Sequence, residues 1–169
     1  MICSIEIAER MQQAGVLLTE IHEIDLCLWM FGMPASVYCR GGNRGPHPLD
    51  VEDTALLTLD YGDFAASLDL SFMRKPVGRG FRIDGTQASL IWRDGPGPLT
   101  MISADGDEET FALPDAFHPE DCFASLIRAF LGGHGPLDTE GSLQAGLQSL
   151  QIVQAAKASM ASGRAEALV

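Results

Sequence analysis

The chain has 169 residues, 46% of them hydrophobic and 20% charged, which is enough for one globular domain with its own core. Its formal net charge of −12 and pI near 4.5 argue against nucleic acid and anionic membrane surfaces as partners, because both repel an acidic protein. The four cysteines show no paired spacing, which favours reduced thiols and a cytoplasmic location. We therefore expect a single domain over residues 1–169.

Two helices are expected at the start of the chain. Helix-forming residues 4–13 predict a short first helix, and Gly15 separates it from a longer helix that stops at Gly32. The apolar run within the longer helix, residues 24–33, is far shorter than the roughly 20 residues of a membrane span. The main apolar stripe of this helix has amphipathic spacing and comprises Leu17, Ile21, Ile24, Leu28 and Phe31.

A neighbouring face of the longer helix carries a possible polar site. His22 and Asp25 lie three residues apart on this face, between Leu18 and Trp29. Because most of the helix circumference is apolar, we expect His22 and Asp25 to be buried, and buried polar groups are hydrogen-bonded or used in chemistry. From the residues alone, His22 is more simply a core histidine whose hydrogen bonds are satisfied.

From residue 35 the pattern changes to the two-residue period of β-strands. Gly62-Asp63 and three Asp-Gly dipeptides, at 84–85, 94–95 and 105–106, predict tight turns between antiparallel strands. Seven strands are expected, over residues 36–40, 54–61, 64–72, 80–84, 88–93, 99–104 and 109–113.

Two further helices follow the strands. One begins at Pro119 and stops at Gly132, and the last begins near Asp138 and runs to Gly163. The whole pattern predicts an α+β fold with a large antiparallel or mixed β-sheet of about seven strands, covered on one face by helices. Its open face predicts a dimer. The apolar stripe expected on the last helix comprises Leu143, Leu147, Leu150 and Val153.

Charged residues concentrate at two places. Arg74, Lys75, Arg79 and Arg82 are four of the eleven basic residues. They could bind an acidic sugar or a cofactor phosphate held by another domain, or form a charged strand edge that resists aggregation. The acidic residues at 105–109 lack the spacing of a calcium loop and indicate a solvated hairpin tip. The histidines at 47, 118 and 134 lack ligand spacing, so no metal site is expected.

Several segments resemble one known domain. Residues 15–25 read GVLLTEIHEID, and with Trp29 and Gly32 they resemble the motif that opens the C-terminal domain of the Gfo/Idh/MocA oxidoreductases, the glucose–fructose oxidoreductase and inositol dehydrogenase family. Residues 51–55, 81–86 and 155–163 resemble later landmarks of that domain. Together these segments extend over nearly the whole chain in the same order.

The resemblance implies half of a two-domain enzyme. In the family, an N-terminal Rossmann domain holds NAD(H) or NADP(H), and the C-terminal domain supplies a sheet for substrate binding and oligomer contacts. No G-x-G-x-x-G loop, whose backbone amides cradle a pyrophosphate, follows a strand in this sequence, and the family's Glu-Lys-Pro segment has no counterpart. We expect the chain alone to bind no cofactor, with NAD or NADP belonging to the complete enzyme.

The resemblance also suggests site residues. His22 matches the histidine that the family places beside the reacting hydroxyl, where an imidazole can assist proton transfer near neutral pH. Many members have an aspartate four residues earlier, where this chain has Leu18, with Thr19 and Glu20 as the nearest polar side chains. Asp25 matches an aspartate associated with holding the helix and its histidine in place.

The sequence therefore predicts the substrate-binding and oligomerisation domain of an NAD(P)-dependent oxidoreductase acting on a sugar or cyclitol hydroxyl, inactive alone. The alternative is a non-enzymatic self-association or carbohydrate-binding module derived from that family. Expected partners are a sugar or polyol, a second copy bound through the open sheet face, and a separately encoded Rossmann-domain protein. The predicted catalytic residue is His22, and the predicted substrate-binding residues are Thr19, Glu20, Asp25, Arg74, Lys75 and Arg79.

Overall fold

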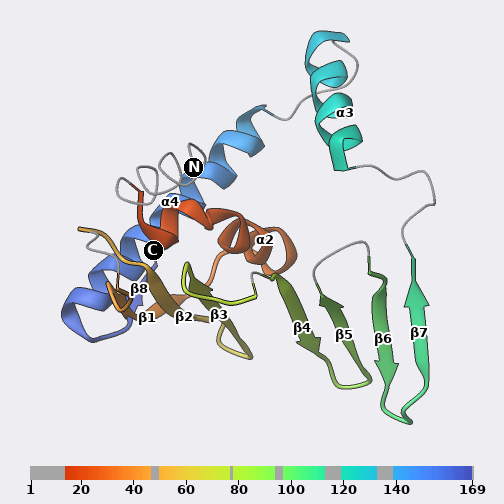
Figure 1. Ribbon diagram of the computed structural model, residues 1–169, viewed down its shortest axis with the longest axis horizontal. Helices are drawn as coiled ribbons and strands as arrows, with labels where there is room; N and C mark the ends of the chain where they lie inside the picture. The colour runs from red at the N-terminus through yellow and green to blue at the C-terminus, as the bar shows by residue number, and fades with distance from the viewer. Residues whose placement is uncertain are drawn as a thin grey trace. The chain divides into compact units, whose positions relative to one another are not determined.

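The computed structural model describes residues 14–46, 50–76, 78–93, 97–112, 119–132 and 139–168 (Figure 1). The chain divides into two compact units, one of Met1–Met73 with Asp138–Val169 and one of Arg74–Leu137. The expected first helix, residues 4–13, lies outside the described residues. The expectation of one domain over residues 1–169 stays a prediction.

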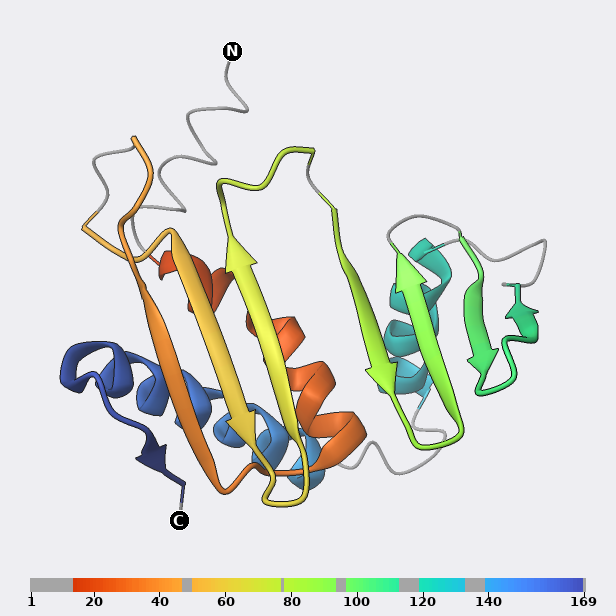
Figure 2. The ribbon, with the colours of Figure 1, turned by 90° about the horizontal axis from the view of Figure 1, so that it is seen from below.

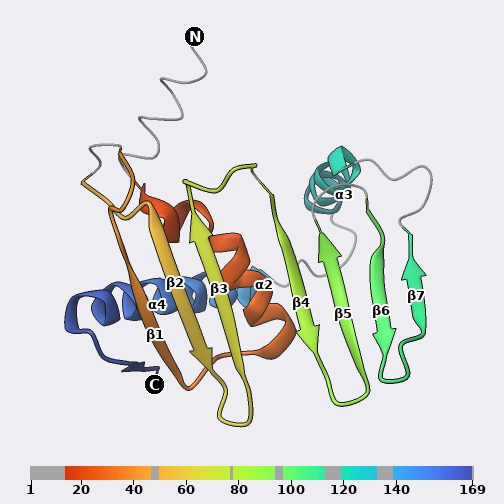
Figure 3. The same cartoon turned by 60° about the horizontal axis from the view of Figure 1, so that its bottom comes forward.

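The first unit is a two-layer arrangement of a sheet and helices. Its four strands are all paired antiparallel and lie in the order β3-β2-β1-β8. Figures 2 and 3 show two helices against one face of this sheet, while the other face stays open. The elements are α2 (Ile21–Phe31), β1 (Ser36–Gly42), β2 (Thr54–Asp60), β3 (Ala65–Ser71), α4 (Thr139–Ser162) and β8 (Glu166–Ala167).

The core lies between this sheet and its helices. Along β2, Ala55, Leu57 and Leu59 are buried while Leu56 and Thr58 face the open side, as the two-residue period of a strand requires. The expected apolar stripe is confirmed, because Leu17, Ile24 and Leu28 are buried and its other two members are half-buried. The rest of the core comprises Val16, Leu17, Ile24, Leu28, Val37, Cys39, Leu68, Leu70, Ile152, Val153 and Ala156.

Of the four residues expected to form the buried stripe of helix α4, Val153 is buried and the other three are exposed. Leu143 and Leu147 are 67% and 50% exposed, whereas Ile152 and Val153 are buried. The reason is that the C-terminal half of this 24-residue helix packs on β1. Ser159 is part of that contact, and its hydroxyl accepts a hydrogen bond of 2.9 Å from the Cys39 amide. None of the described helices is long and apolar enough to cross a membrane.

The second unit is an antiparallel meander followed by a helix. Its strands lie in chain order and pair only with their neighbours. Gly106, in the last turn, has φ of +88°, a conformation that the expected Asp-Gly turn supplies. The Asp-Gly at 94–95 lies outside the described residues. The elements are β4 (Gly80–Asp84), β5 (Ala88–Arg93), β6 (Leu99–Ser103), β7 (Glu108–Phe111) and α3 (Pro119–Gly132).

The expected fold class is confirmed. The protein is α+β with antiparallel strands, and all seven expected strands are present. They are hydrogen-bonded as two four-stranded sheets rather than as one sheet of about seven, and the short β8 is the additional strand. A run of alternating residues predicts a strand but does not tell which of two sheets the strand joins.

A buried carboxylate fixes the loop between β1 and β2. The two carboxylate oxygens of Asp53 accept hydrogen bonds of 2.9 and 2.7 Å from the amides of Arg44 and Gly45. Burial tends to raise the pKa of Asp53, but the backbone hydrogen bonds and one from the Thr54 hydroxyl outweigh it and lower the pKa below its ordinary value. The loop is therefore held by an ionised side chain.

The substitution Asp53→Asn should destabilise the fold. It removes a charge-assisted acceptor, and we expect the free energy of unfolding to fall by about 1–3 kcal/mol near neutral pH. Because the folded-state pKa is lowered, the stabilisation by Asp53 is present above its unfolded pKa and is lost as pH falls through the folded pKa. Urea unfolding between pH 3 and 7 measures both effects. Asp63→Asn, at the exposed β2–β3 turn, is the control, and an equal loss in both variants would contradict this account.

Candidate functional site

The candidate site lies at the start of α2. Residues 14–19 are helical and lead into α2 through Glu20, which has φ of −102° and ψ of 28°. The Glu20 amide donates a 2.9 Å hydrogen bond to the Val16 carbonyl, and the Glu23 amide donates one of 3.1 Å to the Glu20 carbonyl. These bonds join the two helical segments. They therefore fix the backbone at the junction, where Thr19, Glu20 and His22 lie.

Glu52 anchors this helical segment to the sheet. Its backbone carbonyl accepts a 2.8 Å hydrogen bond from the Val16 amide, and its Oε1 accepts one of 3.3 Å from the Leu17 amide. Lys157 Nζ lies 3.8 Å from the same Oε1. Gly15 has φ of +68°, and a Cβ at this position would overlap the Glu52 carboxylate. The segment that precedes His22 therefore requires a glycine at its contact with Glu52.

The face of α2 that carries His22 is exposed, so the expectation of a buried His22–Asp25 pair is wrong. His22 and Asp25 are both exposed, and Trp29 on the same face is 82% exposed. The physical reason is that a helix in the outer layer of a two-layer unit buries only the stripe that meets the sheet. An apolar residue elsewhere on the circumference does not by itself cover its polar neighbours.

Asp25 is held by the neighbouring helix and not by His22. The hydroxyl of Ser149, which is 3% exposed, lies 3.2 Å from Asp25 Oδ1 and 3.1 Å from the Ala145 carbonyl. These two acceptors share its one proton. Within the described part of the chain, no hydrogen bond joins Asp25 to His22. The carboxylate therefore ties α2 to α4 and leaves the imidazole facing solvent.

The other residues predicted for the site fall into two groups. Thr19 and Glu20 precede His22 in the first unit, and the Thr19 hydroxyl donates a 2.8 Å hydrogen bond to the Gly15 carbonyl. Arg74, Lys75 and Arg79 are exposed and belong to the second unit. The two interpretations of this basic segment, ligand binding and a protected strand edge, both remain open. The fourth basic residue, Arg82 on β4, forms a salt bridge with Asp84 on the same strand, and the distance from its Nε to Asp84 Oδ1 is 2.8 Å.

Two thiols and one phenol of the first unit are held in their neutral forms. Burial, followed by the charge of Glu23, raises the pKa of the Cys27 thiol to about 11. Burial likewise raises the pKa of the Cys39 thiol to about 11 and that of Tyr61 to about 12. Thiolate chemistry at neutral pH is thus disfavoured at both cysteines. The described residues contain no group of three or more His, Cys, Asp or Glu side chains that could hold a metal ion.

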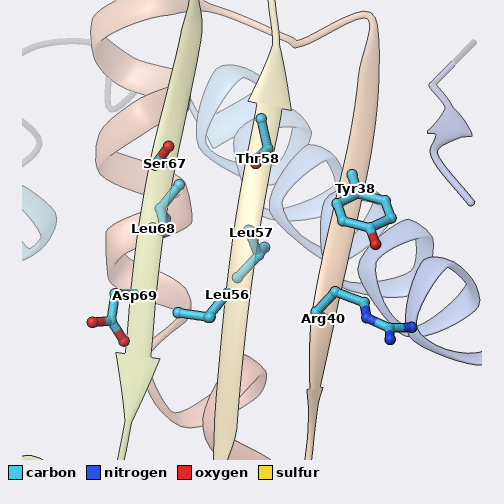
Figure 4. A pocket seen from close by; sticks show the side chains of 8 residues that line it. All are labelled: Tyr38, Arg40, Leu56, Leu57, Thr58, Ser67, Leu68 and Asp69. Carbon is cyan, nitrogen blue, oxygen red and sulfur yellow. The ribbon is translucent and has the colours of Figure 1, made fainter. Parts of the chain in front are cut away.

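The open face of the first sheet carries a shallow concavity that the sequence analysis did not identify. Its volume is about 320 Å³, and Figure 4 shows its side chains on β1, β2 and β3. The alternation of buried and exposed residues is visible in the sequence, but the register that brings the exposed ones together is not. The concavity lies across the sheet from α2, away from His22. Its lining residues are Tyr38, Arg40, Leu56, Leu57, Thr58, Ser67, Leu68 and Asp69.

Comparison with known proteins supports the expected ancestry. A sequence profile of the GFO/IDH/MocA C-terminal domain matches residues 7–91. No curated protein matches the chain. The matched segment includes α2, strands β1 to β3, β4 and most of β5.

Solved structures share the fold at low sequence identity. A protein from Klebsiella pneumoniae assigned as an oxidoreductase is 22% identical, with a TM-score of 0.72 over 93% of this chain and 51% of its own. An oxidoreductase from Agrobacterium radiobacter, in complex with NAD+, L-tartaric acid and magnesium, is 23% identical, with a TM-score of 0.67 over 88% and 47%. The WlbA dehydrogenase from Bordetella pertussis, in complex with NADH and UDP-GlcNAcA, is 21% identical, with a TM-score of 0.58 over 91% and 48%. The chain spans about half the length of each.

Two glycine substitutions should change stability in opposite directions. Gly15→Ala places a Cβ against the Glu52 carboxylate at a positive φ, so we expect a loss of about 1–3 kcal/mol. Gly146→Ala, in α4, meets no atom within 4 Å, and helix propensity predicts a gain of about 0.5–1 kcal/mol. Thermal and urea unfolding measure both. A Gly15→Ala variant as stable as the parent would show that Glu52 does not position this segment.

Proposed function

Because the chain belongs to the GFO/IDH/MocA family and carries its C-terminal domain, we propose that it forms the substrate-binding and oligomerisation half of an NAD(P)-dependent oxidoreductase. We assign the substrate as a sugar or cyclitol hydroxyl. The observation that carries the proposal is His22 on the exposed face of α2, inside the segment that the family profile matches. The Agrobacterium and Bordetella structures, with L-tartaric acid and UDP-GlcNAcA, support a hydroxylated substrate that bears an acidic group.

The chemistry assigned to this chain is proton transfer. An exposed imidazole can accept the proton that a substrate hydroxyl loses as its carbon is oxidised, and can return it in the reverse direction. The Thr19 hydroxyl already donates to the Gly15 carbonyl, so its oxygen remains free to accept a hydrogen bond from the substrate. Glu20 supplies a second acceptor. Asp25 acts through the helix that it ties to Ser149.

The basic segment at the start of the second unit binds the acidic group of the substrate in the same proposal. Arg74, Lys75 and Arg79 are assigned to an acidic group of the substrate, because guanidinium and ammonium groups bind carboxylates and phosphates. All three side chains are exposed. Arg82 is not part of this assignment; its guanidinium donates hydrogen bonds to Asp84 and Ser89.

The described residues do not fit a dinucleotide. A pyrophosphate is bound where a parallel strand leads through a glycine-rich loop into a helix N-terminus. Every strand pair in the described part of this chain is antiparallel. We therefore propose that a Rossmann domain outside these residues, in the same protein or in a separate one, holds NAD or NADP. The chain alone is catalytically inactive in this proposal.

Assembly and location complete the proposal. The open face of the first sheet is assigned to contacts with a second copy, because an antiparallel sheet with one uncovered face either meets water or a partner. The free thiols of Cys27 and Cys39 suit a reducing compartment, so we place the protein in the cytoplasm.

A second function is favoured by one observation. Leu18 is 37% exposed beside His22, at the position where many family members have an aspartate, and an apolar side chain cannot pass on a proton. The second candidate is therefore a non-enzymatic self-association or carbohydrate-binding module that keeps the fold of the family.

Titration with NADH tests the division between the two halves. The purified chain should produce no saturable change in NADH fluorescence, because its described residues offer no site for the pyrophosphate. A Rossmann-domain relative measured in parallel confirms that the assay detects binding. Saturable binding at micromolar concentration would refute the claim that the cofactor belongs elsewhere.

A polyol and sugar-acid screen by calorimetry or ligand-observed NMR separates the two functions. If His22 contacts the reacting hydroxyl, His22→Ala should weaken binding of the responding compound by about tenfold, through loss of a hydrogen bond in a partly buried contact. Asp63→Ala, at the exposed β2–β3 turn, is the control. Binding that survives His22→Ala unchanged would favour the carbohydrate-binding module, and the absence of any binding would favour self-association alone.

A further inference from the structure

Buried polar side chains are few in the described part of the chain, where they comprise Glu52, Asp53, Ser149 and Ser159. A buried polar group costs stability unless it is hydrogen-bonded, so each of these side chains requires a partner. Asp53 holds the loop between β1 and β2, and Ser159 bonds to β1. The other two, Glu52 and Ser149, both contact the helical segment that carries His22.

Ser149 connects α4 to the helix on the C-terminal side of His22. It lies inside α4, where alanine would be the better helix former. Its hydroxyl is 3.1 Å from the Ala145 carbonyl, four residues earlier, and 3.2 Å from Asp25 Oδ1. A contact with the carbonyl four residues earlier is available to any serine in a helix. The contact with Asp25 is therefore the one that joins α4 to another element.

Glu52 provides a second connection on the N-terminal side of His22. Its backbone carbonyl and its Oε1 accept hydrogen bonds from the amides of Val16 and Leu17, respectively. Lys157 of α4 lies on the other side of this carboxylate, with its Nζ 3.8 Å from the same Oε1. His22 therefore lies between two polar connections to α4, one before it in the chain and one after it.

The two connections have equal spacing on the two helical segments, which lie on the same face of the first sheet (Figure 3). Leu17 and Asp25 are eight residues apart, and so are Ser149 and Lys157. Eight residues of α-helix span about 12 Å. The order of the contacts is reversed, so the two segments pass each other in opposite directions. Apolar packing between them is non-directional, whereas hydrogen bonds have limits of distance and angle, so the polar contacts select one register.

We propose that Ser149 and Lys157 are positioning residues for His22. They act through Asp25 and Glu52, and they fix the register of the His22 helix on α4. This inference rests on the proposed role of His22 and adds two residues outside the segment that the family profile matches, 7–91. Ser149 has the larger effect because it is buried, whereas the side chain of Lys157 is 42% exposed and water screens its ion pair.

Amide hydrogen exchange tests the positioning without any ligand. Ser149→Ala should speed exchange of the α2 amides by about two- to tenfold, because loss of the hydrogen bond lowers the free energy of local opening. Ser159→Ala is the matched control, since it removes a similarly buried hydroxyl from the same helix and should speed exchange in β1 instead. An equal effect of both variants on α2 would overturn the proposal, because Ser149 would then be a general stabiliser.

A double-mutant cycle isolates the contact between Ser149 and Asp25. Asp25→Ala should speed exchange in α2 as Ser149→Ala does, and the double variant should exchange no faster than either, because both changes remove one shared interaction. Asp25→Asn keeps an acceptor oxygen and should preserve wild-type exchange. Additive effects of the two alanine variants would overturn the pairing. Lys157→Met should speed exchange at residues 16–19 by about twofold, and unchanged exchange there would overturn the role of Lys157.

Ligand affinity tests whether this register matters at His22. The probes are myo-inositol, a cyclitol, and D-glucuronate, a sugar acid, both measured by calorimetry. For a probe that the wild-type protein binds, Ser149→Ala should raise Kd by about three- to tenfold, because a displaced imidazole bonds the substrate hydroxyl less well. Ser159→Ala should leave Kd unchanged, and an unchanged Kd in Ser149→Ala would overturn the positioning role. If neither probe binds while exchange responds as expected, the result supports the contact with α4 and counts against the proposed substrate.

Discussion

The alternation of side chains along β1, β2 and β3 is the constraint on which the first unit depends. In each strand, every second side chain packs against the helices and the others lie on the open face. A shift of the pairing by one residue would move Leu57 and Leu59 to solvent and bring Leu56 and Thr58 into the core. The same register therefore secures the helix that carries His22 and brings together the side chains that line the concavity. The helix-covered side and the open side of the first unit therefore both depend on the register of one sheet.

Much of this arrangement could be predicted from local sequence. The strand period, the glycine turns and the buried stripe of α2 are all short-range patterns, and the structure confirms them. The expected stripe of α4 was right at Val153 and wrong at Leu143 and Leu147, which have helical spacing but precede the half of the helix that packs on β1. Amphipathic spacing identifies a face that can be buried, but the partner that buries it is specified elsewhere in the chain.

The candidate site shows the same limit more clearly. His22 and its neighbours were identified by resemblance, whereas their exposure depends on how many layers the unit has. The bond between Asp25 and Ser149 joins residues 124 positions apart, so no local pattern could indicate it. The concavity depends on three strands in register and was not predicted. Residue types near a motif can thus suggest chemistry, while the geometry that allows or prevents it depends on contacts between distant segments.

Ser159 and β8 have a consequence for the behaviour of the protein at high concentration. The outer edge of β1 is a row of backbone groups that could pair with a strand from another molecule. Residues 36 and 37 on this edge pair with β8, and the Cys39 amide donates to the Ser159 hydroxyl. These bonds occupy part of the β1 edge with two residues of strand and one side chain. A strand from another molecule would have to displace them in order to pair along the whole of β1, which disfavours growth by strand addition on this side.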